Sequence, residues 1–383
     1  ILEAKGSEIE LNVLFFKELV PGGSNDLIKA MVTALGGTIT ADDAVYPLLQ
    51  VKIDPARIED LARLPEIRWI EQYYPPKAHM NNVRQTTGGR FVEIAEFDGT
   101  GIVGEVKDDG IEWEHPDLVN NLFDMDGNVS RQAHGTHTFG VIFSDAASDT
   151  SSARLAKGMM PGGTGIFCDW GVNRRQSIDH LKTNWNGRFQ SNSWSQGQDT
   201  GQYLALSAWN DQIINDFDVS MLYSGSNDGV EPMAISSDAV SKNVIGVGAV
   251  TCGNNADMSD DRWILAGVGN TPAQGPAADG RIKPDLVSHF DDVFCTDMLG
   301  GAGSWRNDYY PWFGGTSASC PIVAGCAGLT YQMYEENHFG NNPGGEIPHT
   351  ATVKAILIAN AHQYPFDRAT RFQQGWGFAD VGR

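Results

Sequence analysis

The first eighty residues alternate between strand-like and helix-like patterns of apolar positions. Runs of apolar residues predict strands over 10–17, 46–53 and 67–71. Between the first two, residues 25–35 repeat their apolar positions at helical spacing and are followed by two glycines, a typical stop signal.

A second helix is predicted to begin at Asp54 and Pro55, because aspartate is a favoured N-cap and proline is tolerated in the first helical turn. Ile58, Leu61 and Leu64 then share one face of that helix. The expected order is β-α-β-β-α-β, a small split-βαβ sandwich, although the apolar runs mark only three of its four strands.

The sequence Tyr-Tyr-Pro-Pro at 73–76 is typical of an extended linker. It separates a small α+β domain of the ferredoxin-like kind, residues 1–80, from a second domain, residues 81–383. The second segment is long enough to bury the core of one sizeable α/β domain.

The most informative motif near the C-terminus is F-G-G-T-S-A-S-C-P-I-V-A-G, which contains Ser317. Gly314 and Gly315 allow a tight turn and the close approach of a ligand, and residues 322–334 have helical character. Ser317 is therefore expected at a helix N-terminus, where free N–H groups favour developing negative charge. Pro321 is tolerable in a first helical turn.

A serine nucleophile needs a base to accept its proton and a carboxylate to orient that base. His134 opens the apolar stretch H-G-T-H-T-F-G-V-I, and Asp108 ends the strand-like run G-I-V-G-E-V-K-D-D-G-I. Each motif alone has an ordinary structural interpretation: a turn before a buried helix for the Ser317 motif, a hydrogen-bonded structural histidine for His134 and a solvated turn residue for Asp108. Their joint occurrence favours a catalytic triad.

These motifs together resemble the subtilisin-like serine proteases. The resemblance rests on D-D-G, on H-P-D-L with Asp117 nine residues after Asp108, on H-G-T-H and on G-T-S-A-S-C-P. It covers the chain from about residue 81 onward and implies a three-layer α/β fold with a mostly parallel sheet. It also implies a serine endopeptidase in which Asp108 is the triad aspartate, His134 the general base and Ser317 the nucleophile.

Two further segments fit the same family. In S-M-L-Y-S-G-S-N-D-G, Asn227 matches the asparagine whose amide stabilises the oxyanion, although a turn asparagine is an equally good interpretation of the loop alone. In Q-S-N-S-W-S-Q-G, Ser193, Trp194 and Ser195 match the strand that pairs with the substrate backbone and forms one wall of the specificity pocket. Trp194 also has an interpretation as a core residue. The expected substrates are extended polypeptides with an apolar or aromatic side chain in that pocket.

The chain departs from the family pattern at two positions. Lys107 precedes the triad aspartate where relatives have an apolar residue, and strand alternation places it opposite Asp108 and on the same face as Glu105. A pairing of Glu105 with Lys107 is the resulting hypothesis. Ser195 stands where the family has glycine.

A second class of proteases shares G-T-S but uses a glutamate for the histidine and an aspartate for the asparagine, so His134 and Asn227 exclude it. A histidine base must be neutral to accept a proton, so activity is expected to rise through about pH 6 to 7.

Residues 1–80 resemble the inhibitory and folding-assisting prodomain of the family. The resemblance implies a self-processing zymogen whose N-terminal domain is an intramolecular inhibitor until the chain is cut, between Lys77 and Val83. The alternative is a permanent N-terminal domain.

The net charge and the apolar runs limit the kinds of binding partner that are expected. The formal charge is −21; residues 1–80 carry 8 basic and 12 acidic groups, so −17 remains on the larger part. Nucleic acid is a poor partner for such a surface, because phosphate binding requires clustered cations. No apolar run reaches the ~18 residues of a membrane span. Export from the cell is expected only by analogy with the family.

No cofactor is required for the expected chemistry, but structural calcium is an expectation from the family. Asp117 matches a family calcium ligand, and Asp145 and Asp149 follow the histidine motif where relatives supply others. The five cysteines allow no pairing to be deduced.

Two other functions remain open at this point. One is a catalytically silent binding protein with the same fold, which the intact triad disfavours. The other is an esterase or acyltransferase, which the G-T-S-A-S-C-P context disfavours because α/β-hydrolases place their serine in G-x-S-x-G.

Overall fold

The computed structural model describes residues 8–16, 19, 25–42, 47–72, 79–151, 154–305 and 307–383. The chain divides into two compact units, Ile1–Lys77 and Ala78–Arg383. Each unit has its own hydrophobic core. The predicted linker at 73–76 lies outside the described residues.

The smaller unit is an antiparallel sheet with two helices. Its elements are β1 (Ile9–Phe15), α1 (Asp26–Ala34), β2 (Thr38–Asp42), β3 (Leu48–Ile53), α2 (Ile58–Ala62) and β4 (Ile67–Gln72). The strand order is β2-β3-β1-β4, and every second residue of β1 is buried, so one face of the sheet holds the core. The chain order is the β-α-β-β-α-β predicted from the sequence.

Local sequence features explain most of this unit. The Asp54 carboxylate accepts a hydrogen bond from the Ala56 N–H at 2.9 Å, and Pro55 opens the short 3₁₀ turn that leads into α2. Strand β2 is not indicated by the apolar pattern, because four of its five residues are exposed. Its pairing with β3 makes it a strand.

The larger unit is built on a seven-stranded sheet in which all neighbouring strands are parallel. The strands are β5 (Val103–Asp108), β6 (Leu122–Asp126), β7 (Thr164–Asp169), β8 (Phe189–Asn192), β9 (Ser220–Ser224), β10 (Ile245–Val250) and β11 (Leu286–His289). Their order in the sheet is β11-β10-β9-β8-β5-β7-β6. Strands β8 to β11 are buried along their whole length, as expected for a parallel sheet covered on both faces.

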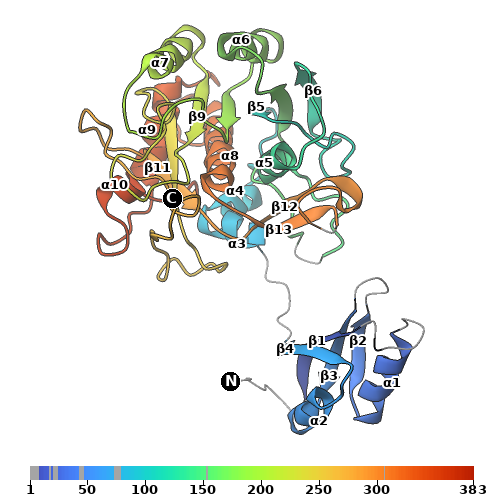
Figure 1. The fold of residues 1–383 in the computed structure, drawn as a ribbon. Helices are drawn as coiled ribbons and strands as arrows, with labels where there is room; N and C mark the ends of the chain where they lie inside the picture. Colours follow the sequence, from blue (N-terminus) through green and yellow to red (C-terminus); the bar gives the residue numbers. More distant parts are fainter. Residues whose placement is uncertain are drawn as a thin grey trace. The chain divides into compact units, whose positions relative to one another are not determined.

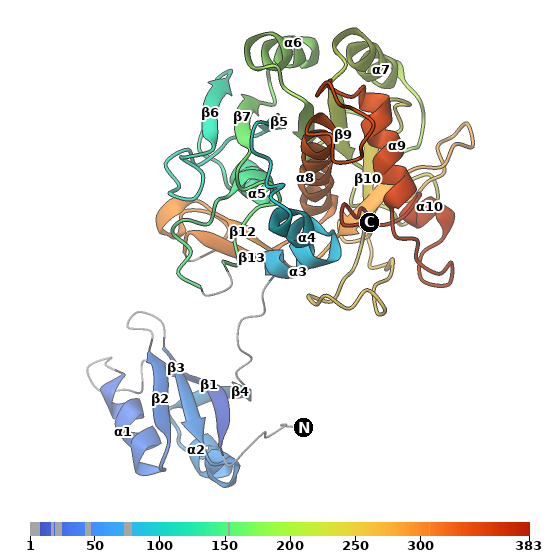
Figure 2. The same ribbon diagram turned by 180° about the vertical axis from the view of Figure 1, so that it is seen from behind.

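Helices cover both faces of this sheet (Figures 1 and 2). They are α3 (His79–Thr86), α4 (Gly89–Ile94), α5 (Ala133–Phe143), α6 (Arg174–Trp185), α7 (Ala205–Phe217), α8 (Thr316–Glu335), α9 (Thr350–Asn360) and α10 (Arg371–Gln374). Alternate residues of β9 face different cores: Leu222 packs with α5 and α8, whereas Met221 and Tyr223 pack with α6 and α7. The unit is therefore a three-layer α/β structure. A separate hairpin consists of β12 (Val293–Thr296) and β13 (Tyr309–Phe313).

Helix α8 is buried over most of its length in the larger unit, and glycines at its closest contacts make room for neighbouring side chains. A Cβ on Gly325 would lie 2.3 Å from the Met159 side chain, and one on Gly328 would lie 2.2 Å from the Met160 sulfur. The helix begins at Thr316, so Pro321 lies in its second turn, and the expectation of a first-turn proline was wrong.

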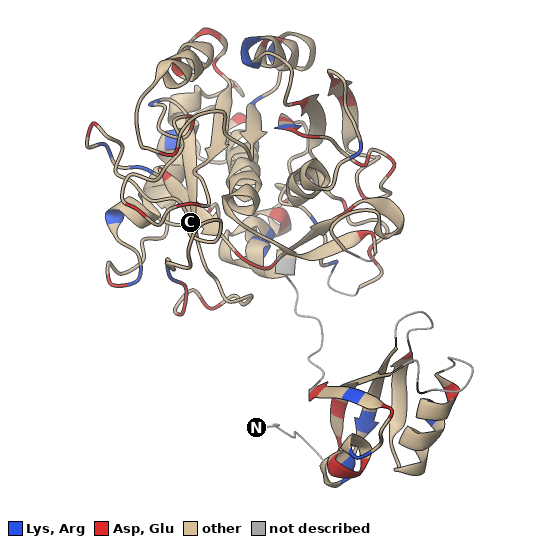
Figure 3. Ribbon diagram, in the orientation of Figure 1, with Lys and Arg blue, Asp and Glu red and all other residues tan. Residues whose placement is uncertain are grey.

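Acidic side chains are distributed over both units (Figure 3), in keeping with 48 acidic against 27 basic residues in the chain. Among the helices that the structure describes, none combines the length and apolar character needed to cross a membrane.

Candidate active site

The predicted site residues come from separate elements that meet at the carboxyl edge of the parallel sheet. Asp108 is the last residue of β5, and Ser193 directly follows β8. Asn227 lies in the loop after β9. His134 and Ser317 lie in the first turns of α5 and α8. Open α/β sheets place their ligand sites at this edge.

Asp108 and His134 form a direct pair. Nδ1 of His134 lies 2.8 Å from Oδ1 of Asp108, and the Asp108 carboxylate is fully buried. The Asp109 N–H donates to the same oxygen at 2.8 Å, and the Thr138 hydroxyl donates to the other oxygen at 3.1 Å. The carboxylate is therefore held in one orientation behind the imidazole ring.

Opposing influences act on the pKa of His134. Burial is the largest single influence and lowers this pKa, but the charge and hydrogen bond of Asp108, with the charge of Asp109, raise it further than burial lowers it. The pKa of His134 is consequently above that of a free histidine.

Ser317 is held against the segment after β8. Its hydroxyl donates to the Ser193 carbonyl at 3.3 Å, and the Ser193 hydroxyl donates to the Ser317 carbonyl at 3.0 Å. That carbonyl is available because Pro321, four residues further along α8, has no N–H to donate to it. Within the described residues, no hydrogen bond joins Ser317 to His134, so the expected contact between the two is not formed in this rotamer.

Asn227 is fixed through its side-chain oxygen, which leaves its amide donors available. The oxygen accepts hydrogen bonds from the N–H and hydroxyl of Thr316, at 2.8 and 3.0 Å. Gly315 has φ +78°, and a Cβ there would lie 2.9 Å from the Asn227 amide nitrogen. Glycine is therefore required at 315 for both its backbone conformation and the position of the amide.

Trp194 is held in place by a hydrogen bond and by ring packing. Its indole N–H donates to the Lys107 carbonyl at 2.7 Å, and its ring packs edge-on against Tyr223 and beneath the Arg174 guanidinium. Ser195, the next residue, is exposed. Trp194 therefore anchors the segment, and the exposed Ser195 is accessible to a ligand.

The predicted pairing of Glu105 with Lys107 was wrong, although the two side chains are buried as strand alternation requires. The Lys107 ammonium donates to the carbonyls of Asp169 and Val172, at 3.2 and 2.7 Å, because the turn after β7 surrounds it. Glu105 instead accepts from the Gln190 amide at 2.5 Å. Burial raises the pKa of Glu105 to about 8.

The region around Asp117 does not fit a calcium ion. One carboxylate oxygen of Asp117 accepts from the Ser148 N–H at 2.5 Å and the other from the Tyr309 hydroxyl at 2.8 Å. The carboxylates of Asp145 and Asp149 are likewise bonded to nearby amide groups. In the described part of the chain, the one cluster with metal-ligand spacing is Asp108, Asp109 and His134, which the Asp–His pair explains.

All five cysteines are buried and unpaired. Burial raises the pKa of Cys320 to about 12, which keeps its thiol protonated and unreactive at neutral pH.

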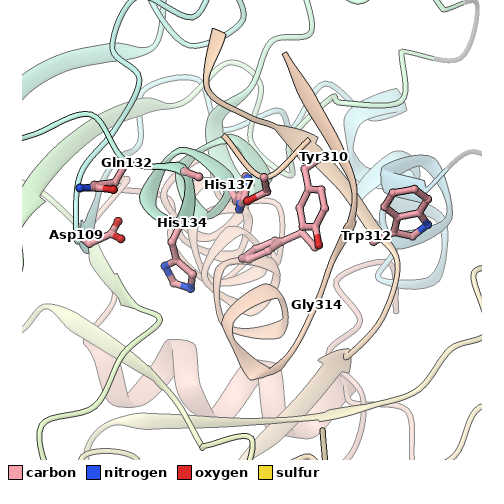
Figure 4. Close-up of a pocket in the computed structure, with 10 residues that line it drawn as sticks. Asp109, Gln132, His134, His137, Tyr310, Trp312 and Gly314 are labelled. Atoms are coloured by element: carbon pink, nitrogen blue, oxygen red, sulfur yellow. The ribbon is translucent and has the colours of Figure 1, made fainter. Parts of the chain in front are cut away.

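A cavity of about 460 Å³ lies beside His134. Figure 4 shows Tyr310 and Trp312 of β13 on one side of it and Asp109 and Gln132 on the other. Sequence reasoning did not identify this cavity. The aromatic run Y-Y-P-W-F directly before the G-G-T-S motif was the feature that could have indicated it.

The hairpin that bears these aromatic residues is tied to helix α5. Nε2 of His137, one turn after His134, lies 3.0 Å from a carboxylate oxygen of Asp297. The same carboxylate accepts from the N–H groups of Ser304 and Trp305, and the His137 ring stacks on Tyr310. The described part of the loop between β12 and β13 is thus anchored to the helix that bears His134.

Fold and side chains together define an α/β serine hydrolase. The subtilase family model matches residues 99–377, so the chain belongs to the subtilase family, whose members are serine endopeptidases. The serine protease AprX of Bacillus subtilis is 26% identical over 268 residues, which cover 61% of this chain and 58% of AprX. The membrane-bound transcription factor site-1 protease of Mus musculus is 29% identical over 165 residues, 43% of this chain and 13% of that protein.

A solved structure shows the same fold. The prenylagaramide maturation protease PagA matches with a TM-score of 0.58 and 19% identity, over 77% of this chain and 95% of that chain. At this identity, the likeness concerns the fold alone.

Proposed function

We propose that this protein is a serine endopeptidase that hydrolyses extended polypeptides through an acyl-enzyme. The observation that carries the proposal is the hydrogen-bonded pair of His134 and the buried Asp108, which lies at the same edge of the sheet as Ser317 and Asn227. In this proposal Ser317 is the nucleophile, His134 the general base and Asp108 the residue that orients the imidazole.

The reaction begins when the Ser317 hydroxyl turns about its Cα–Cβ bond from the Ser193 carbonyl towards Nε2 of His134. His134 accepts the proton as the oxygen attacks the scissile carbonyl, and then donates it to the leaving amine. Water then attacks the acyl carbonyl and loses a proton to His134. The bond between this carbonyl and the Ser317 oxygen breaks, and His134 returns the proton to that oxygen. Asp108 stays ionised and stabilises the imidazolium formed in both steps.

The oxyanion is stabilised by the Asn227 amide and the Ser317 N–H. Thr316 fixes the Asn227 oxygen, so the amide nitrogen needs no reorganisation when charge develops. A donor of this kind lowers the barrier by roughly 3 to 4 kcal/mol. The positive end of the α8 dipole adds to the same field.

The substrate backbone is proposed to lie along Ser193, Trp194 and Ser195 as an additional strand. This mode of binding gives affinity from main-chain hydrogen bonds, whatever the side chains. The cavity beside His134 is lined by other residues than Ser193 to Ser195, and it is proposed to receive the leaving-group part of the peptide.

The experiment that tests this function compares wild type with Ser317→Ala. We expect a fluorophosphonate to label the wild type and not the variant, and only the wild type to cleave unfolded casein. Labelling without casein cleavage, together with turnover of short-chain esters, would favour the esterase or acyltransferase. No labelling would favour a silent binding protein.

The smaller unit is proposed to be a prodomain, which inhibits the larger unit until the prodomain is cleaved off. The enzyme is also proposed to act outside the cell. Residues 79–86 form helix α3, and a protease requires an extended segment, so the cut is proposed before His79 and not as far along as Val83. Mass spectrometry of active wild type should show loss of Ile1 and a new N-terminus near residue 78. A persistent full-length species in an active preparation would overturn this.

A further inference from the structure

Asp199 lies four residues after Ser195, the last residue of the segment proposed to bind substrate. One of its carboxylate oxygens accepts a hydrogen bond from the Ser226 hydroxyl at 2.6 Å. The other oxygen is buried and has no hydrogen-bond partner within the described residues. Ser226 directly precedes Asn227, so this unused acceptor lies next to the proposed oxyanion site.

The backbone fixes this carboxylate from two sides. Asp199 forms an antiparallel bridge with Ser236, whose N–H donates to the Gly225 carbonyl at 2.7 Å. Ser226 has φ +132°, a region in which a residue with a side chain is strained. Its hydroxyl both donates to Asp199 and accepts from the Asp228 N–H at 3.1 Å, which gives a reason for a serine there.

The charge of Asp199 is not neutralised by any basic side chain within 4 Å in the part of the chain that the structure describes. Its neighbour Asp238 differs, because Arg174 forms an ion pair with it at 2.5 Å. Burial, followed by the charges of Asp228 and Asp238, raises the pKa of Asp199. A buried carboxylate oxygen without a partner is costly unless a ligand supplies a donor.

We propose that Asp199 determines substrate specificity by binding the cationic side chain of a lysine or arginine in the residue whose carbonyl is attacked. In this arrangement the substrate backbone lies along Ser193 to Ser195. The lysine or arginine whose carbonyl is bound by Asn227 then extends its side chain past Ser226 to Asp199. The inference rests on the proposed function, and it replaces the apolar or aromatic preference expected from the sequence.

The first test uses fluorogenic peptides that differ only at this residue, Arg, Lys, Gln or Phe. We expect wild type to cleave the Arg and Lys peptides with a kcat/KM at least about 30-fold above the Gln peptide, the scale of a desolvated charge pair. Asp199→Asn keeps an acceptor for Ser226 and should remove this preference. Asp228→Asn is the matched control, because it removes an equal negative charge from a carboxylate that already accepts a hydrogen bond from the Gly269 N–H. In this control the ratio of kcat/KM for the Arg peptide to that for the Gln peptide should persist.

A preference for Phe in wild type, or an unchanged Arg to Gln ratio in Asp199→Asn, would overturn the proposal. The second test measures binding of the cation p-aminobenzamidine by fluorescence, in the full chain carrying Ser317→Ala. We expect binding that weakens at least about 10-fold when Asp199→Asn is added, and equal binding would overturn the proposal. The Ser317→Ala variant cannot catalyse, so this test measures the cation site apart from peptidase activity. If binding depends on Asp199 but wild type cleaves no peptide, the proposed peptidase function is rejected and the cation site is retained.

Discussion

The side-chain oxygen of Asn227 accepts two hydrogen bonds from Thr316, the residue that precedes Ser317. The proposed oxyanion donor and the proposed nucleophile are thereby fixed to the same helical turn. A substrate carbonyl held by one is automatically placed next to the other.

Replacement of this donor should affect catalysis more than binding. We expect Asn227→Ala to lower kcat by about 10²- to 10³-fold with little change in KM, because the amide interacts with charge that exists only in the transition state. Steady-state kinetics on a peptide substrate measure both constants. Thr316→Ser keeps the hydroxyl and is the matched control; a rise in KM alone in Asn227→Ala would contradict the assigned role.

The pH profile should report the environment of His134. Its pKa is raised by Asp108 and Asp109, and the base must be neutral to act, so kcat/KM should reach half its maximum above pH 6.5. Asp109→Asn removes one negative charge and should move this midpoint to lower pH. Asp108→Asn should instead lower kcat by about 10⁴-fold, since it disturbs the tautomer of the ring.

A midpoint that stays in place in Asp109→Asn would show that this charge does not act on His134. Both variants remove one negative charge near His134. Each is therefore the control for the other, since only Asp108→Asn should lower kcat strongly and Asp109→Asn should only shift the midpoint.

The hydrogen bonds of Asp117 predict a stability that does not depend on calcium. Chelator should leave the melting temperature of the Ser317→Ala variant unchanged, since Ser148 and Tyr309 already occupy both carboxylate oxygens. Tyr309→Phe removes one of these bonds and should reduce the free energy of unfolding by about 1 to 3 kcal/mol. A chelator-induced fall in melting temperature, reversed by calcium, would restore the family expectation.

The positions of the proposed catalytic residues at a strand end and at helix starts could be predicted, because each residue lies in a short motif whose local form is encoded nearby. Alternation along β5 also predicted that Lys107 is turned away from Asp108. It could not predict the acceptors of Lys107, because these carbonyls belong to the turn after β7, more than sixty residues further on. The contact of His137 with Asp297 spans 160 residues and is likewise a product of tertiary packing.

The buried Glu105 should make stability fall as pH rises. Its pKa is raised to about 8 in the folded protein, so between about pH 4.5 and 8 the folded state holds a proton that the unfolded state has lost. Over that range the free energy of unfolding should decrease by about 1.4 kcal/mol per pH unit from this group, and the loss is complete above pH 8. Glu105→Gln retains an acceptor for Gln190 and cannot ionise.

Thermal unfolding should be followed in the Ser317→Ala background, where self-digestion cannot interfere. Glu105→Gln should raise the melting temperature at pH 8 relative to its parent and leave it nearly unchanged at pH 4, whereas the exposed control Glu231→Gln should change neither. A Glu105→Gln effect of equal size at both pH values would mean that packing, and not ionisation, accounts for the difference.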